Sequence, residues 1–216
     1  MNLPFDQAEV LTALATVYLA VAERLEHAPR HAAMREARRA CHKALRCARL
    51  MPGWLPEALR LHGTSDWLSG NQAAAQKHWR ESLEVAEKSA FPIERARTLL
   101  EIGYRTGDID LIEQACEVFR HTGATVFLAF ALHSLAQLRS RSTTQPAAAI
   151  LDYAKAIAAL EEVKADYELA LASSQCARLQ EQLGQSEAAR ANLEKAKALF
   201  IACGESGQRM PLTQEA

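Results

Sequence analysis

The chain has 216 residues, of which 49% are hydrophobic, 24% are charged and 6% are aromatic. This apolar content supplies a core for one domain or one repeat array and excludes extensive disorder. Alanine and leucine dominate the apolar residues, which favours closely packed helices over sheets. The formal net charge of −1 gives the chain as a whole no electrostatic attraction to nucleic acid or to an anionic membrane.

The cysteines and the longest apolar run indicate the compartment. The five cysteines (Cys41, Cys47, Cys116, Cys176 and Cys203) are odd in number and not closely paired, which is typical of buried thiols in a reducing compartment. The run from Val10 to Ala22 is shorter than the roughly 20 residues that span a bilayer, and it lacks a basic flank. We therefore expect a cytoplasmic protein with no membrane partner.

Helical periodicity dominates from end to end. In chain order it predicts helices over residues 6–25, 30–50, 56–69, 72–89, 92–105, 109–121, 125–139, 145–161, 165–182 and 185–203. Prolines at 29, 52, 56, 92 and 146 stand at or near the predicted helix starts, where a missing N–H costs nothing. Glycines at 53, 70, 107, 123, 184 and 204 follow the predicted ends, where a positive φ is needed.

Three segments of the chain resemble one another. Each contains a helix that ends in an aromatic or long side chain, then a glycine, a polar residue and an alanine-bearing helix. The turn glycines are Gly70, Gly107 and Gly184, at intervals that fit one and then two helix pairs. Such self-similarity at a regular period indicates a helical repeat array.

One of these segments carries the tetratricopeptide (TPR) pattern. Its small, aromatic, turn, alanine, aromatic and leucine positions are filled by Gly63, Trp67, Gly70, Ala75, Trp79 and Leu83. The later repeats end in "VFRHTGA" and "LFIACGE", and they look like the C-terminal helical repeat domains of MalT-like bacterial regulators. The resemblance covers about residues 5–203 and implies a protein-interaction role in bacterial regulation or signalling.

The predicted fold is all-α, a right-handed α-α superhelix (a TPR-like solenoid) of about five antiparallel helix pairs. We expect one repeat domain over residues 1–203 and a flexible tail over 204–216. The first helix of each pair should line a concave groove. The first helix of the chain is apolar on more than one side, which suggests self-association as a homo-oligomer, a covering domain, or a buried cap.

No catalytic motif accompanies this pattern. The sequence lacks GxSxG, GxxxxGK[ST], HExxH and GxGxxG. Pro29 interrupts the helix face that His27 and His31 would share, and Cys41, His42 and Cys47 do not lie on one side of a helix. We predict no catalytic residue, no metal site and no cofactor, and hence not an enzyme.

The second helix carries a basic face. Its members are Arg35, Arg38, Arg39, Arg46 and Arg49. This face is either a solvated surface, a dock for an acidic protein partner, or a contact for a phosphate backbone. No aromatic residues alternate with the arginines, so nucleic acid is disfavoured.

The repeat register also predicts which residues face the groove. They are Arg60, Thr64, Trp67, Glu94, Arg97, Glu101, Tyr104 and Arg178. Aromatic and Arg side chains are effective anchors for a peptide, although Trp67 and Tyr104 could equally pack between helices. The Lys/Asn/Arg set that clamps carboxylates in chaperone-binding TPR domains is not found at these positions.

The favoured function is therefore a non-catalytic scaffold or adaptor that binds a peptide or partner domain. The alternative is a domain that senses a small ligand, which would need a deep apolar pocket with convergent polar groups, whereas an open channel lined by charge favours the scaffold.

Overall fold

The computed structural model describes residues 4–141 and 146–204, and every element within these ranges is helical. The chain divides into two compact units, Met1–Ile102 and Gly103–Ala216. The first unit holds α1 (Pro4–Arg24), α2 (His27–Ala48), the 3-10 turn η1 (Pro52–Trp54), α3 (Leu55–Leu68) and α4 (Gln72–Lys88). Helix α5 (Pro92–Thr106) crosses the boundary. The second unit holds α6 (Ile109–Thr122), α7 (Thr125–Ser140), α8 (Pro146–Glu162), α9 (Asp166–Gln182) and α10 (Ser186–Ala202).

The predicted helices are confirmed within a few residues at each end, because prolines, glycines and capping residues act locally on the chain. Asp108 caps α6 by accepting a hydrogen bond from the Leu111 N–H at 3.3 Å. Five of the six turn glycines have a positive φ, the exception being Gly53. The prediction for Gly53 was wrong because Pro52 starts a 3-10 turn that continues the chain directly into α3.

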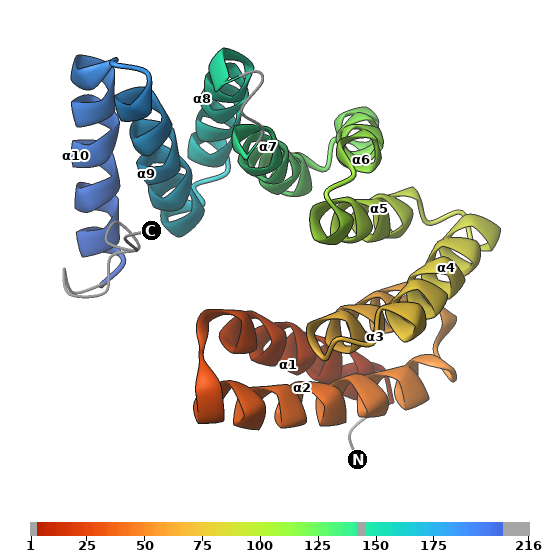
Figure 1. Ribbon diagram of the computed structural model, residues 1–216. Coiled ribbons are helices and arrows are strands. Elements are labelled where there is room, and N and C mark those ends of the chain that lie inside the picture. Colours follow the sequence, from red (N-terminus) through yellow and green to blue (C-terminus); the bar gives the residue numbers. More distant parts are fainter. Residues whose placement is uncertain (1–3, 142–145, 205–216) are drawn as a thin grey trace. The chain divides into compact units, whose positions relative to one another are not determined.

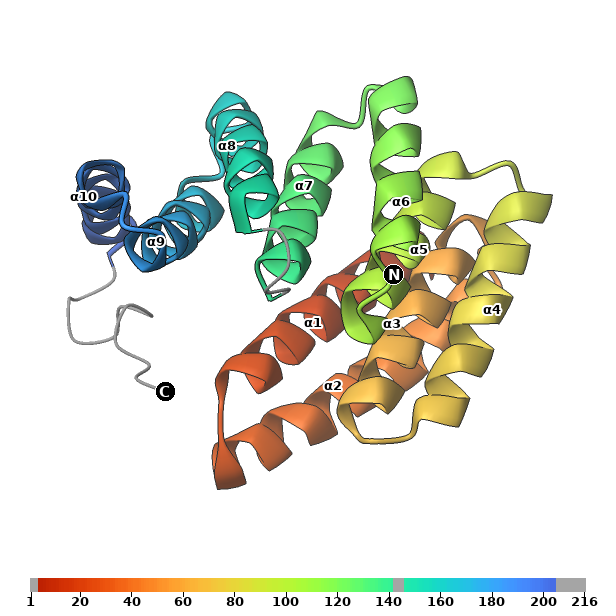
Figure 2. The same cartoon turned by 45° about the horizontal axis from the view of Figure 1, so that its top comes forward.

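Neighbouring helices of the first unit pack as antiparallel pairs. α1 lies along α2 and α3 lies along α4, while α1 also contacts α3, the first helix of the next pair (Figures 1 and 2). The core between α1, α2 and α3 is built from small residues with two leucines, Leu19 and Leu61, among them. Its alanines allow the helix axes to approach closely.

One contact inside the α3–α4 pair explains the spacing of small and aromatic residues. Trp79 of α4 is only 1% exposed, and its indole Nε1 donates a hydrogen bond to the Arg60 carbonyl at 3.1 Å. A Cβ atom added at Gly63 would lie 2.5 Å from the Trp79 ring. Position 63 therefore requires a glycine, because the indole occupies the space where a side chain would stand.

The second unit repeats the arrangement. α7 lies along α8 and α9 lies along α10, and α7 contacts α9. Its main core places Tyr153 and Leu160 of α8 against Leu169 and Cys176 of α9. The predicted tail, residues 204–216, lies outside the described residues apart from Gly204, which has a φ of 79°.

The first helix has an uncovered apolar stripe. Val10, Leu14, Val17 and Val21 recur at helical spacing and are all exposed. Self-association through this stripe stays a prediction.

None of the helices within the described ranges is long and apolar enough to cross a membrane.

The cysteines are mostly buried, as predicted. Burial raises the pKa of the Cys41 thiol to about 12 and that of the Cys116 thiol to about 11. Both thiols therefore remain protonated and unreactive at neutral pH. The expectation was wrong for Cys203, which follows the last turn of α10 and is exposed.

Candidate functional site

Five of the predicted groove residues come together on α3 and α5. Arg97 of α5 donates hydrogen bonds to Glu94 at 2.7 Å and to Glu57 of α3 at 2.8 Å. The Thr64 hydroxyl of α3 donates to a Glu101 oxygen at 2.8 Å, and Arg60 lies 3.4 Å from Glu57. These residues form a network of alternating charges that ties α3 to α5.

The network is largely buried, and its electrostatics reflect this. Burial lowers the pKa of the Arg60 guanidinium, and the nearby positive charge of Arg97 lowers it further. Burial also acts to lower the pKa of Arg97, but Glu57 and Glu94 outweigh it, so that pKa is raised. Two buried atoms, Arg60 Nε and Glu94 Oε2, have no hydrogen-bond partner within the protein. The hydrogen-bonding capacity of these two atoms is left to water or to a bound group.

The other three predicted groove residues lie elsewhere. Trp67 is half-buried against Trp79, with ring centroids 5.6 Å apart, so it packs inside the α3–α4 pair. Tyr104 belongs to the second unit, where the Arg105 guanidinium stands 5.6 Å from its ring centroid. Arg178 lines a separate hollow of about 490 Å³ between α9 and α10, together with Arg190 and Lys197.

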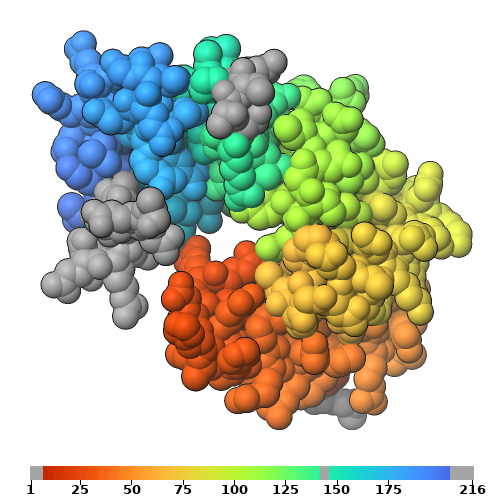
Figure 3. Space-filling model, in the orientation of Figure 1, coloured from red at the N-terminus to blue at the C-terminus, as the bar shows by residue number. Residues whose placement is uncertain are grey.

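The basic face of α2 borders a hollow with a volume of about 690 Å³. This basic hollow is lined by Arg30, His31, Met34, Arg35, Arg38, Arg39 and His42 of α2 and by Leu68 and Ser69 at the end of α3. Its four arginines are all exposed, and α2, orange in Figure 3, reaches the surface on the face drawn. The remaining arginines of the predicted face lie apart: Arg46 lines a smaller hollow beside α1, and Arg49 caps the end of α2.

The positive charge of the basic hollow is mostly uncompensated. No acidic residue lines it. Among the described residues, Glu36 forms the only ion pair with these four arginines, at 2.7 Å from Arg39, and both side chains of that pair are well exposed. Exposed guanidinium groups that converge on one hollow can bind carboxylates in the bidentate manner.

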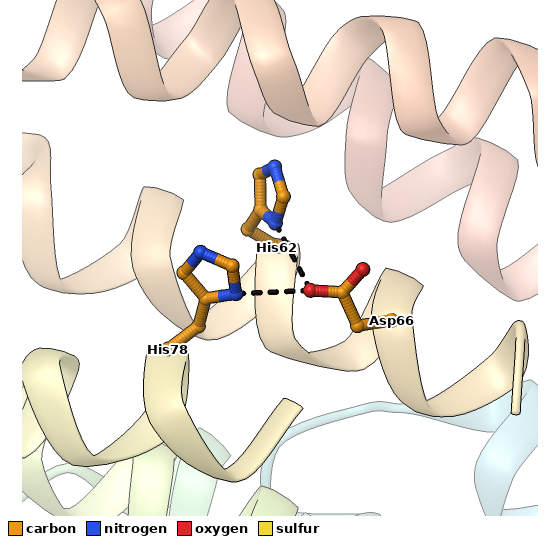
Figure 4. A group of neighbouring side chains, drawn as sticks. All are labelled: His62, Asp66 and His78. Atoms are coloured by element: carbon orange, nitrogen blue, oxygen red, sulfur yellow. Dashed lines mark hydrogen bonds and ion pairs between the residues drawn. The ribbon is translucent and has the colours of Figure 1, made fainter. Parts of the chain in front are cut away.

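A cluster of histidines lies next to this hollow and is absent from the sequence-based expectations. Asp66 of α3 lies 3.4 Å from His62 Nδ1 and 2.9 Å from Nδ1 of His78, which comes from α4 (Figure 4). On the other side, His62 Nε2 is 3.2 Å from Nδ1 of His42 on α2. The prediction of no metal site considers the spacing of possible ligands within one helix, whereas this cluster is formed by side chains of three helices. The one local signal is the His62–Asp66 spacing of one helical turn.

Comparison with known proteins shows the fold. No protein-family model matches the sequence, and no curated protein matches it. BtubC (BKLC) from P. vanneervenii is 15% identical, with a TM-score of 0.63 over 97% of this chain and 96% of that one. The apo form of RapI is 12% identical, with a TM-score of 0.58 over 93% of this chain and 85% of that one. A putative kinesin light chain of Podosopora anserina, with nearly identical TPR-like repeats, is 14% identical, with a TM-score of 0.59 over 95% of this chain and all of that one.

At these identities the likeness concerns the fold alone. The chain has the all-α, TPR-like helical repeat fold that its sequence predicts. The closer resemblance to MalT-like regulators stays a prediction.

Proposed function

We propose that this chain is a non-catalytic protein-interaction module that recognises an acidic segment of a partner protein through the basic hollow on α2. The TPR-like fold supports the general role, because stacked helices present side chains on a stiff frame and little ordering cost is paid on binding. The observation that carries the proposal is the convergence of Arg30, Arg35, Arg38 and Arg39 on one hollow with no acidic residue in its lining.

The charge distribution explains why this hollow, and not the wall of α3 and α5, is the primary contact. In that wall Arg97 already binds Glu57 and Glu94, and Glu101 accepts a hydrogen bond from Thr64, so a peptide would have to displace an internal partner. The arginines of the basic hollow are exposed and need no such exchange. The unpartnered Arg60 Nε and Glu94 Oε2 make the wall a secondary contact in this proposal.

The character of the hollow also bears on the alternative of a small-ligand sensor. A sensor pocket is usually closed and apolar, with a few polar groups that fix the ligand. Here most of the lining comes from guanidinium and imidazole side chains that are exposed to solvent. An extended acidic chain, with one carboxylate for each cation, fits such a surface better than a compact apolar ligand. The regulatory setting is inferred only from the resemblance of the later repeats to MalT-like domains.

The proposal is tested by selecting peptides from a random display library on the full chain. We expect enrichment of peptides with clustered Asp and Glu, and affinities that fall as salt rises. The triple variant Arg35→Gln, Arg38→Gln, Arg39→Gln should weaken the best peptide at least tenfold. The matched control, Lys77→Gln with Arg80→Gln and Arg120→Gln, removes three exposed cations from α4 and α6 and should bind normally.

Two results would contradict the proposal. Enriched peptides without an excess of acidic residues would show that the hollow does not select by charge. Single-stranded DNA that binds as tightly as the best peptide, and loses binding in the same triple variant, would assign the hollow to a phosphate backbone instead.

A further inference from the structure

We propose that His62, Asp66 and His78 form a binding site for a transition-metal ion of the Zn²⁺ type. The inference does not rest on the proposed function: its three ligands come from α3 and α4, and only His42 of α2, which contacts His62, also lines the basic hollow. One ligand atom from each of the three residues lies within 4.8 Å of the other two. Two imidazoles and a carboxylate are a donor set that suits zinc and its neighbours in the first transition series.

Two of the three donor–donor distances can be compared with those around a tetrahedral ion, and the third is within 4.8 Å. With metal–ligand distances of about 2.0–2.2 Å, neighbouring ligand atoms of a tetrahedron are about 3.3–3.6 Å apart. His62 Nδ1 and Asp66 Oδ2 are 3.4 Å apart, and His78 Nδ1 is 2.9 Å from the same oxygen. A rotation of the His78 side chain, which is 20% exposed, can open the shorter edge without moving α4. A fourth ligand, such as a water molecule, would complete the tetrahedron.

The state of His62 is the second observation that points to a ligand. Its side chain is 7% exposed, yet its Nδ1 has no hydrogen-bond partner. The 3.4 Å separation from Asp66 is longer than an N–H···O bond normally spans. A buried ring nitrogen that faces a carboxylate at ion-pair distance, without a hydrogen bond to it, is an arrangement that a cation between the two would satisfy.

His42 supplies the support that metal-binding imidazoles usually have. Its Nδ1 lies 3.2 Å from His62 Nε2, the nitrogen opposite the proposed ligand atom. If His62 Nε2–H donates to His42, the proton is fixed on Nε2 and Nδ1 presents its lone pair to the metal. His42 thus acts as a positioning residue, not as a ligand.

The protonation state of His62 is compatible with this role. Burial lowers the pKa of the His62 imidazole, and the nearby His78 lowers it further, although Asp66 acts in the opposite direction. A lowered pKa favours the neutral ring, which is the form that binds metals. His78 would hold its ring proton on Nε2 in the metal-bound form.

The test is a Zn²⁺ titration of the full chain, prepared without a histidine tag and treated with a chelator, in competition with a chromophoric chelator. We expect one high-affinity equivalent, and a visible absorption band of tetrahedral type when Co²⁺ is used. His78→Gln and Asp66→Asn should each weaken Zn²⁺ binding at least tenfold, with helicity preserved by circular dichroism. His121→Gln, which removes an exposed histidine from α6, should leave the affinity unchanged.

A measurement on the wild-type protein keeps the proposal testable if a variant does not fold. Zn²⁺ should shift the ring nitrogen resonances of His62 and His78 and leave those of His121 in place. His42→Gln should weaken the affinity for Zn²⁺ and alter the Co²⁺ spectrum. If His42 had only a structural role, the substitution would leave the Co²⁺ spectrum unchanged. Three results would overturn the proposal. The first is that the wild type binds no stoichiometric Zn²⁺, and the second is that His78→Gln and Asp66→Asn bind Zn²⁺ as tightly as the wild type. The third is that the bound equivalent of Zn²⁺ is lost only in a Cys47→Ser, Cys203→Ser variant.

Discussion

Gly63 and Trp79 show how one residue position sets the distance between two helices. In an open helix, replacing Gly63 with Ala would stabilise by about 1 kcal/mol through backbone entropy. Here the added methyl would stand 2.5 Å from an indole that is 1% exposed and already hydrogen-bonded to the Arg60 carbonyl. Moving the ring away would break this hydrogen bond and disturb its buried contacts.

We therefore predict that Gly63→Ala destabilises the chain by about 1–3 kcal/mol, because overpacking outweighs the helix propensity. Urea unfolding followed by circular dichroism measures the change. Gly53→Ala is the control, since a methyl there meets nothing within 4 Å. Equal stability of Gly63→Ala and wild type would mean that α3 and α4 are not in tight contact at this point.

His133 makes stability depend on pH. Its side chain is buried in α7, and its Nε2 donates to Gln175 at 2.9 Å. Burial lowers the pKa of this imidazole from 6.5, while the Gln175 hydrogen bond and the charge of Glu168 partly oppose the shift. The unfolded chain thus takes up the proton more readily. The stabilisation is fully present above the unfolded-state pKa and is lost as the pH falls through the lower folded-state pKa.

We expect the free energy of unfolding to decrease between about pH 7 and about pH 5, and to decrease less in His133→Gln. Part of the decrease should remain in the variant, because the pKa of His62 is lowered in the same direction. His121→Gln should follow the wild type, since that side chain is exposed. A His133→Gln curve parallel to that of the wild type would refute the assignment.

At the scale of elements, the sequence predicts the helices well and their lateral contacts poorly. Prolines and glycines act on the chain within a few residues, so the helix boundaries follow from local chemistry, as at Gly70 and Pro92. The pairing of Glu57 with Arg97 joins residues 40 positions apart and depends on the rotation of α3 against α5. The repeat register places such side chains on one wall, but it does not reveal that they bind one another.

The network between α3 and α5 should contribute measurably to the free energy of unfolding. Side-chain exposure in the Arg97–Glu57 pair is 21% and 14%. Arg97→Ala would leave the Glu57 and Glu94 carboxylates without this cation in a partly buried site. We expect a destabilisation of about 1–3 kcal/mol, measured by urea unfolding.

A matched variant distinguishes burial from charge in this test. Arg39 forms an ion pair with Glu36 at the same 2.7 Å distance as Arg97 with Glu94, but its side chain is 69% exposed. Arg39→Ala should cost less than about 1 kcal/mol, because solvent screens such pairs. Equal losses in Arg39→Ala and Arg97→Ala would contradict the buried network.

At the scale of the whole molecule, the repeat architecture follows from the sequence, whereas the contact surface does not. The TPR positions identify the fold because Gly63, Trp67, Ala75 and Trp79 pack inside one helix pair, and because Gly70 adopts the positive φ of its turn. The predicted groove draws residues from both compact units, from Arg60 to Arg178, so it stays a prediction. The His62 cluster could not be predicted, because it exists only once α2, α3 and α4 are packed together.

The charge on α2 was visible in the sequence, but the hollow was not. Helical spacing places Arg35, Arg38 and Arg39 on one side of α2. The contribution of Leu68 and Ser69, which close the hollow from α3, depends on the α2–α3 contact. The structure thus shows that part of the basic stripe borders a defined hollow, which we propose as the contact for an acidic segment.

Photo-crosslinking from this hollow in the native host tests the central claim most directly. A photoreactive residue at Ser69 lies in the lining without removing a cation, and the same residue at the exposed Gln76 of α4 is the control. We predict that Ser69, and not Gln76, is cross-linked to protein segments rich in Asp and Glu, and that Arg35→Gln with Arg38→Gln abolishes the product. Equal cross-linking from both positions, or segments at Ser69 without acidic residues, would contradict the account.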